Sequence, residues 1–386
     1  MPSKHRTLGA LVIGLAVLGL TATEGQAQIV HGQRPQITQG LTYMSWKISG
    51  DEDFTIAQWF IPVSVYAPIA ENFELAVASG VSRSEADWDI SGDDINGFVD
   101  SRIQLAASFL EDQIILSGGA SFPTGKTELT PTQQKLLGFM TTDFLNFPIK
   151  NPGEGLSYFG ELGFALPLGS WVFGAAGTAF IAGEYNPYDT ELSYRPGSRF
   201  IGTVGLERDW EQHHFFAADA IVVVSADDEA DGTPVFRDGT QIDLRLSGRL
   251  AIGKGSIEAG ARYILRGEDR GPSDDHTILI RDARNNNGDD LRLHISPRIP
   301  FATGAAVWLT YDAKILKANG YDTTDALFED AARIQGVGGG LDLRLSEAAV
   351  VRLGFRAWRG SSDGAYGWEP FDLTGYEIIE HLTLTF

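Results

Sequence analysis

The feature that most constrains this chain is a two-residue alternation of apolar and polar side chains, repeated along much of its length. Between residues 242 and 252 the even positions are almost all apolar, whereas the odd positions include Asp243, Arg245 and Arg249. Successive side chains of a β-strand point to opposite faces, so such a segment has one apolar and one polar face. The pattern therefore predicts strands that meet different surroundings on their two sides.

The alternating segments recur often enough to close a barrel. We place strands at residues 39–48, 53–67, 72–84, 97–110, 113–122, 155–167, 170–183, 198–209, 213–226, 239–252, 255–267, 289–300, 304–317, 333–345, 348–360 and 375–386. From the second strand onward, short connections such as 253–254 alternate with long polar ones such as 123–154 and 268–288. Outer-membrane barrels have short periplasmic turns and long external loops. The sequence predicts an all-β fold over 39–386, a transmembrane antiparallel up-and-down β-barrel of about 16 strands, with about 14 or about 12 as alternatives.

The start of the chain has the order of a secretory signal peptide. Lys4 and Arg6 precede an apolar run over 8–20, and small residues follow up to Ala27. A basic start, an apolar run and a small-residue cleavage site are typical of a signal peptide. We expect cleavage after Ala27, with 28–38 forming a periplasmic N-terminal segment before the barrel.

The last strand resembles the assembly signal of bacterial outer-membrane barrels, in which an alternating strand ends on Phe. The residues that carry this resemblance are Tyr376, Leu382, Leu384 and Phe386. The resemblance implies localisation in the outer membrane of a Gram-negative cell. The implied partners are the barrel assembly machinery, membrane lipid and lipopolysaccharide.

The polar rows of the C-terminal half are rich in arginine. Their basic members are Arg245, Arg249, Arg262, Arg266, Arg292, Arg298, Arg344, Arg352 and Arg356, and their acidic members include Asp243, Glu258, Asp312 and Asp342. Because an arginine that faces lipid costs about 2–4 kcal/mol at mid-bilayer, we expect these rows to line the lumen. Two interpretations stay open: a basic wall that attracts anions into a pore, and a lattice of ion pairs that stiffens the interior.

The long connection 123–154 contains a predicted helix. Thr130 and Gln133 have the spacing of a capping box, with Pro131 at the first helical position. Apolar residues then recur at helical spacing, namely Leu136, Leu137, Met140 and Phe144, before Pro148 ends the run. A short amphipathic helix here would fold into the pore or cover its mouth; packing against neighbouring external loops is the alternative.

Aromatic residues near strand ends are candidates for the interfacial girdles of a membrane barrel. These residues are Trp59, Trp171, Trp308, Tyr311 and Tyr376.

Charge and motif content exclude several functions. A net charge of −21 disfavours nucleic acid as a partner, since phosphate binding needs a basic surface. No cofactor motif fits the strand pattern, and no Ser/His arrangement singles out a catalytic site, so we predict a non-enzyme, with a hydrolase on the outer rim as the lesser alternative. The acidic loops, such as 227–231 and 285–290, predict solvated charge, or calcium binding as an alternative, without a confident metal site.

Three short stretches resemble the outer-membrane transporters grouped with the phenol meta-cleavage pathway, which are distantly similar to long-chain fatty acid channels. They lie at 63–75, 118–125 and 164–168. The resemblance implies passive uptake of small hydrophobic molecules, whereas the arginine-rich rows favour polar or anionic cargo. We therefore expect a channel for passive diffusion of small solutes. The alternatives are a hydrophobic-compound channel gated by 127–154 and a structural or adhesive barrel whose acidic loops bind cations.

Overall fold

The fold is known from a computed structural model. It describes residues 34–50, 53–88, 94–142, 144–188, 192–210, 214–273, 278–325, 327–364 and 370–386. The expected signal peptide, 1–27, lies outside the described residues.

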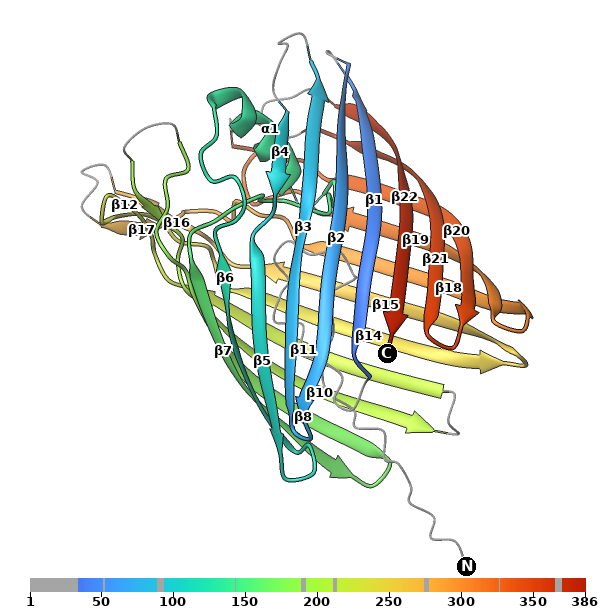
Figure 1. The fold of residues 1–386 in the computed structure, drawn as a ribbon. Helices are drawn as coiled ribbons and strands as arrows, with labels where there is room; N and C mark the ends of the chain where they lie inside the picture. Colours follow the sequence, from blue (N-terminus) through green and yellow to red (C-terminus); the bar gives the residue numbers. More distant parts are fainter. Residues whose placement is uncertain are drawn as a thin grey trace, which may run out of the picture.

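The strands form one closed antiparallel barrel of 16 strands, as predicted. Each strand pairs with the next along the chain, and β22 pairs with β1 to close the wall (Figure 1). β4 and β5 are two parts of one strand, interrupted at residues 99–100. The strands are β1 (Gln36–Ser49), β2 (Phe54–Ala70), β3 (Phe73–Asp87), β4 (Ile95–Phe98), β5 (Ser101–Phe109), β6 (Ile114–Phe122), β7 (Ser157–Leu168), β8 (Trp171–Ile181), β10 (Arg199–Trp210), β11 (His214–Ser225), β14 (Gln241–Ile252), β15 (Gly255–Arg266), β18 (Asp290–Ala302), β19 (Ala305–Leu316), β20 (Ala332–Ser346), β21 (Ala349–Ser362) and β22 (Phe371–Thr385).

Short turns gather at one end of the barrel. Two-residue connections occur at 169–170, 253–254 and 303–304. Gly169, Gly253 and Gly304 have φ values of 68°, 60° and 77° there, a region that glycine enters without steric cost. Consecutive antiparallel strands are joined at alternate ends of the barrel. The long connections therefore lie at the end opposite the short turns, which we call the external end.

The external loops carry small sheets that the sequence did not predict. β9 (Tyr194–Arg195), β12 (Asp228–Ala230) and β13 (Thr233–Phe236) form a three-stranded sheet, and β16 (Arg270–Pro272) pairs with β17 (Leu279–Arg281). Strands of two to four residues contain too few positions for an alternation to be recognised.

The outer face of the barrel is apolar. Leu244, Leu246 and Leu250 are 43%, 53% and 51% exposed, while Asp243 on the opposite face of the same strand is only 1% exposed. A water-soluble barrel would bury such leucines, whereas an apolar outer band is typical of a barrel that crosses a membrane. Among the described residues, no helix is long and apolar enough to cross a membrane.

Several aromatic side chains lie on the outer face, and three of them form a cluster. Tyr43 lies 4.2 Å from Trp59 and 5.5 Å from Tyr376, measured between ring centroids. Trp59, Tyr311 and Tyr376 are all about 40% exposed, and Trp171 meets Phe216 edge-on at 6.2 Å. Four of the five girdle candidates, namely Trp59, Trp171, Tyr311 and Tyr376, therefore occupy positions open to an interfacial girdle.

The expectation for Trp308 is wrong, because its ring lies inside the barrel. Trp308 is 7% exposed and shares the inward face of β19 with Asp312. A Cβ atom on Gly354 would come within 2.6 Å of the Trp308 ring, and one on Gly340 would be equally close. Glycine on two neighbouring strands thus makes room for a large side chain in the lumen.

Candidate functional site

The inward face of β14 and β15 forms an ion-pair cluster around Asp243. The Asp243 carboxylate accepts hydrogen bonds from Arg245 on its own strand and from Arg262 on the next, with closest N–O distances of 2.6 and 2.7 Å. The Asp243 side chain is 2% exposed, and both arginines are about one-quarter exposed. Buried charge of this kind is tolerated because it is paired and hydrogen-bonded.

A second cluster surrounds Asp290, an acidic residue that sequence analysis did not assign to the lumen. Arg292 lies 2.6 Å from its carboxylate, and Lys314 lies 3.9 Å from it. Nearby, Arg266 donates a hydrogen bond to the Gly288 carbonyl oxygen at 3.0 Å. Asp290 is the first residue of β18, and residues at a strand end are the hardest to assign to a face.

A third cluster joins β18, β19, β21 and β22. His294 Nδ1 lies 2.6 Å from Asp312, and Arg356 lies 3.7 Å from Asp312 and 3.4 Å from Glu377. Thr310 also reaches His294 through Nδ1, at 3.4 Å. A hydrolase relay needs the acid and the nucleophile on opposite ring nitrogens, so these three side chains do not form one.

The fourth cluster centres on Asp342 and includes a cavity. Arg298 Nε and Arg352 Nε each lie 2.8 Å from a different oxygen of the Asp342 carboxylate. The two arginines come from strands on either side of β20, one of them beyond β19, so one carboxylate bridges a wide part of the wall. The Asp342 side chain is 9% exposed, but the arginines are 47% and 53% exposed. Their guanidinium groups therefore reach the lumen.

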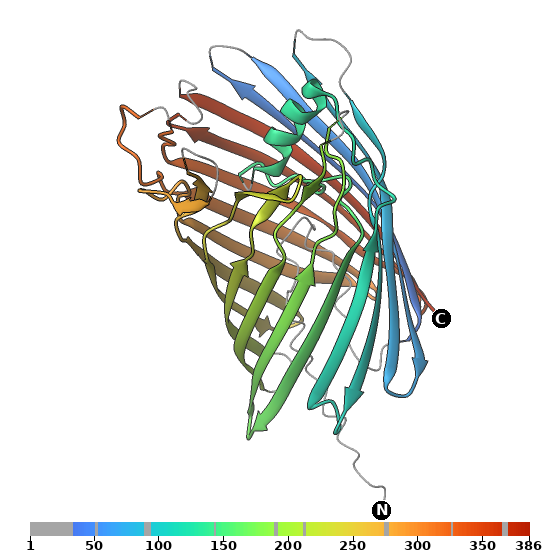
Figure 2. The ribbon, with the colours of Figure 1, turned by 90° about the vertical axis from the view of Figure 1, so that its left-hand side faces the viewer.

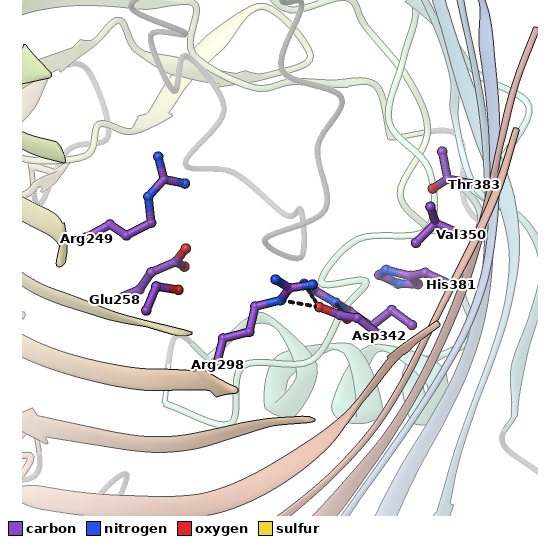
Figure 3. Close-up of a pocket in the computed structure, with 9 residues that line it drawn as sticks. Arg249, Glu258, Arg298, Asp342, Val350, His381 and Thr383 are labelled. Carbon is purple, nitrogen blue, oxygen red and sulfur yellow. Dashed lines mark hydrogen bonds and ion pairs between the residues drawn. The ribbon is translucent and has the colours of Figure 1, made fainter. Parts of the chain in front are cut away.

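The cavity beside Asp342 brings together residues from six strands. It has a volume of about 480 Å³. Figure 3 shows Arg249 and Glu258 on one side, His381 and Thr383 on the other, and Arg298 with Asp342 between them. Ser256, Val350 and Arg352 complete the lining. His381 was missed by sequence analysis because it lies in the terminal strand that was considered only as an assembly signal.

Arg344 lies apart from these clusters, and so do the four residues of the expected assembly signal. The Arg344 backbone N–H donates to Gly304 at a short turn, so this arginine belongs to the end of the barrel opposite the long loops. Tyr376, Leu382 and Leu384 fall on alternate positions of β22, and Phe386 directly follows its last residue. Their proposed role in assembly stays a prediction.

The lumen wall on β5, β7, β8 and β10 has a different composition. Arg102 lies over the Phe159 ring at 3.9 Å, and Thr178 donates a hydrogen bond to Glu161 at 3.2 Å. Glu207 is 8% exposed on the inward face of β10. The inward side chains here therefore include an arginine as well as two acidic groups, in contrast to the arginine-rich wall from β14 to β22.

Helix α1 (Pro131–Thr141) lies in the long connection where it was predicted, and its capping box is present. The Thr130 hydroxyl accepts a hydrogen bond from the Gln133 backbone N–H at 3.3 Å, and the Thr130 backbone N–H donates one to Gln133 Oε1 at 3.1 Å. The helix ends earlier than its apolar pattern suggests. Thr142 is extended, and its hydroxyl donates to the Phe139 carbonyl oxygen at 2.7 Å, a local hydrogen bond that competes with another helical turn.

The helix packs against the inner wall of the barrel. Leu136 and Met140 are 0% and 1% exposed, and they share a buried cluster with inward residues of four strands, Met44, Trp46, Ile56, Ile334 and Leu373. Leu137 and Phe144 are partly buried against the same cluster. Figure 2 shows α1 framed by strands at the external end. The helix thus occupies the external part of the lumen.

Three side chains of the wall hold this segment in place, and sequence analysis missed all three. Trp46 Nε1 donates to the Leu145 carbonyl oxygen at 2.9 Å. Gln58 donates to the Ile149 carbonyl oxygen at 2.8 Å and accepts from the Ile149 N–H at 2.7 Å. Asp100 accepts from the backbone N–H groups of residues 125 and 154, at 2.9 and 2.7 Å. Their signal in the sequence is a polar side chain at an inward position.

The acidic loops are held together by their own ion pairs. Arg284 and Asp322, on neighbouring external loops, lie 2.7 Å apart, and this hydrogen bond lowers the pKa of the Asp322 carboxyl from its ordinary value. Asp227 pairs with Arg237. Within the described ranges, no group of three or more His, Asp or Glu side chains is arranged to hold a metal ion.

No protein-family model matches the chain, and neither does any curated protein. Several solved barrels have a similar overall shape. OprB of Pseudomonas putida has a TM-score of 0.49 and 8% identity, over 90% of this chain and 94% of that one. A mutant of TodX, a monoaromatic hydrocarbon channel, has a TM-score of 0.47 and 9% identity, over 96% and 94%. The outer-membrane channel DcaP of Acinetobacter baumannii has a TM-score of 0.46 and 10% identity, over 95% and 100%.

Proposed function

We propose that this chain is an outer-membrane channel through which small polar solutes diffuse passively. The observation that carries the proposal is the inverted distribution of side chains around a closed barrel. Exposed leucines cover the outside, whereas paired charges line the inside. Only a closed barrel satisfies every backbone group of a strand protein in lipid.

The strand lengths fit a membrane crossing. A tilted strand needs about 9–11 residues to cross the hydrocarbon layer, and the barrel strands β14, β15 and β19 each have 12 residues. A barrel of about 16 strands is wide enough to enclose an aqueous channel unless something fills it. The charged inner wall favours water as the filling, since unpaired parts of the guanidinium groups need solvent.

The inward-folded segment 123–154 narrows this route. Helix α1 and the residues after it fill part of the lumen at the external end, while the cavity near Asp342 lies among residues closer to the short turns. A solute would therefore pass beside α1 before it meets the arginine-rich wall. We propose that the helix limits the size of the solutes that pass and that the arginine-rich wall selects them by their charge.

Planar-bilayer recording tests the channel. The purified full-length mature protein should produce discrete single-channel steps in potassium chloride, because a water-filled lumen conducts ions. Circular dichroism of the same preparation should show the strand content of the folded barrel. A folded protein that stays silent at high density in the bilayer would refute the channel and favour a structural barrel.

A further inference from the structure

We propose that the cavity beside Asp342 is a binding site for one small organic carboxylate, held by Arg249, Arg298 and Arg352. The inference names a substrate class for the proposed channel, and this part of it rests on the proposed channel function. The site itself is argued from the residues that line the cavity.

The cavity has the size of a small-molecule site. Its volume of about 480 Å³ lies within the range of about 300–1,000 Å³ typical of ligand pockets. Val350 and Thr383 contribute a methyl-rich patch and a hydroxyl to its lining. The lining therefore combines a few convergent charged groups with surface that suits the body of an organic ion.

The charge of the lining leaves room for one negative ion. Three arginines face two carboxylates, those of Glu258 and Asp342, so the lining has one positive charge in excess when His381 is neutral. A ligand with a single carboxylate would balance that charge. A doubly charged ligand would meet repulsion from the two acidic side chains.

The arginines bound to Asp342 keep donors for a ligand. A guanidinium group has five N–H donors. Among the described contacts, Arg298 uses only Nε for Asp342, and Arg352 uses Nε and one terminal nitrogen. Asp342 fixes both side chains from behind, while about half of each remains exposed to the lumen. Such a pair is oriented in advance for a second carboxylate.

Arg249 supplies the third cation from the other side of the cavity. It is the cross-strand neighbour of Glu258, and both side chains point into the barrel in Figure 3. Within the described part of the chain, no ion pair shorter than 4.0 Å involves Arg249. The N–H donors of the Arg249 guanidinium group are therefore open to a solute.

Calorimetric titration of the purified full-length protein in detergent micelles tests the site. The probe is sodium benzoate, and benzamide, which has nearly the same shape without the charge, is the ligand control. We expect saturable binding of one benzoate and no binding of benzamide. Arg249→Gln and Arg298→Gln should each weaken benzoate binding by about tenfold or more, the effect expected when a charged hydrogen bond is lost.

Arg359→Gln is the matched control variant. Arg359 lies on β21 next to Trp358, which packs inward against Trp46, so Arg359 faces outward and its loss should leave benzoate binding unchanged. Absence of benzoate binding, equal binding of benzamide, or an equal loss in Arg359→Gln would overturn the site. Tighter binding of inorganic phosphate than of benzoate would overturn the carboxylate assignment.

Bilayer recording on the same preparation separates this site from the channel. Benzoate binding without conductance would refute the channel and keep the site. Conductance without benzoate binding would keep the channel and refute the site.

Discussion

Replacing Gln58 with Leu should release the end of the inward-folded segment from the barrel wall. The Gln58 side chain is fully buried and makes three hydrogen bonds, two with the Ile149 backbone and one with the Ser84 hydroxyl. Leucine has a similar volume but no polar atoms, so the substitution removes the bonds without leaving a large cavity.

The expected magnitude follows from those three bonds. A neutral hydrogen bond contributes about 1 kcal/mol net, and a buried backbone group left without a partner costs at least as much. The docked state should therefore lose about 3 kcal/mol, and the equilibrium constant for local release should rise about 100-fold. Leu136 and Met140 remain buried in the variant, so we expect release around Ile149 rather than loss of α1.

Trypsin reports this release at Lys150, the residue after Ile149. When local opening and closing are fast, the cleavage rate follows the population of the open form, so cleavage at Lys150 should be about 100-fold faster in Gln58→Leu. Gln335→Leu is the control, because Gln335 is exposed on β20 and should tolerate leucine. Equal cleavage rates in Gln58→Leu and the wild-type protein would refute the claim that Gln58 anchors the segment.

Three further substitutions separate packing, charge and lumen size. Leu136→Ala should cost about 2–5 kcal/mol of docking free energy, because the side chain is fully buried, and trypsin should then cut α1 at Lys135. Asp243→Asn should lower the free energy of unfolding in urea by about 3 kcal/mol, since Arg245 and Arg262 lose their shared countercharge; an unchanged urea midpoint would contradict this. Trp308→Ala should raise single-channel conductance while costing about 3 kcal/mol or more of stability, and an unaltered conductance would show that the ring does not limit the lumen.

The barrel could be predicted from the sequence because its signal repeats. A strand with lipid on one side and water on the other must alternate at nearly every position, as residues 242–252 do. Sixteen such segments predict the same architecture, so an error of a few residues in the predicted end of one strand does not change it. The two-residue strand β9 has no such redundancy and was missed.

Side-chain partners could be predicted only in part. The alternation predicts the face of Arg245, and it also places Trp308 on the same inward face as Asp312, although the ring was expected outside. The choice of Asp342 as the shared partner of Arg298 and Arg352 depends on how the four strands β18 to β21 align. The register between strands is set by the whole closed sheet. It cannot be predicted from the alternation within a single segment.

The position of α1 shows why a helix prediction alone leaves the function of a loop open. The capping box determines where the helix begins, and the apolar spacing determines which face it buries. Its site of burial is determined by the wall, because Trp46 and Gln58 place a donor or acceptor opposite the backbone at residues 145 and 149. Inward polar side chains among apolar neighbours are therefore the feature that separates a segment folded into a barrel from one that packs on its external loops.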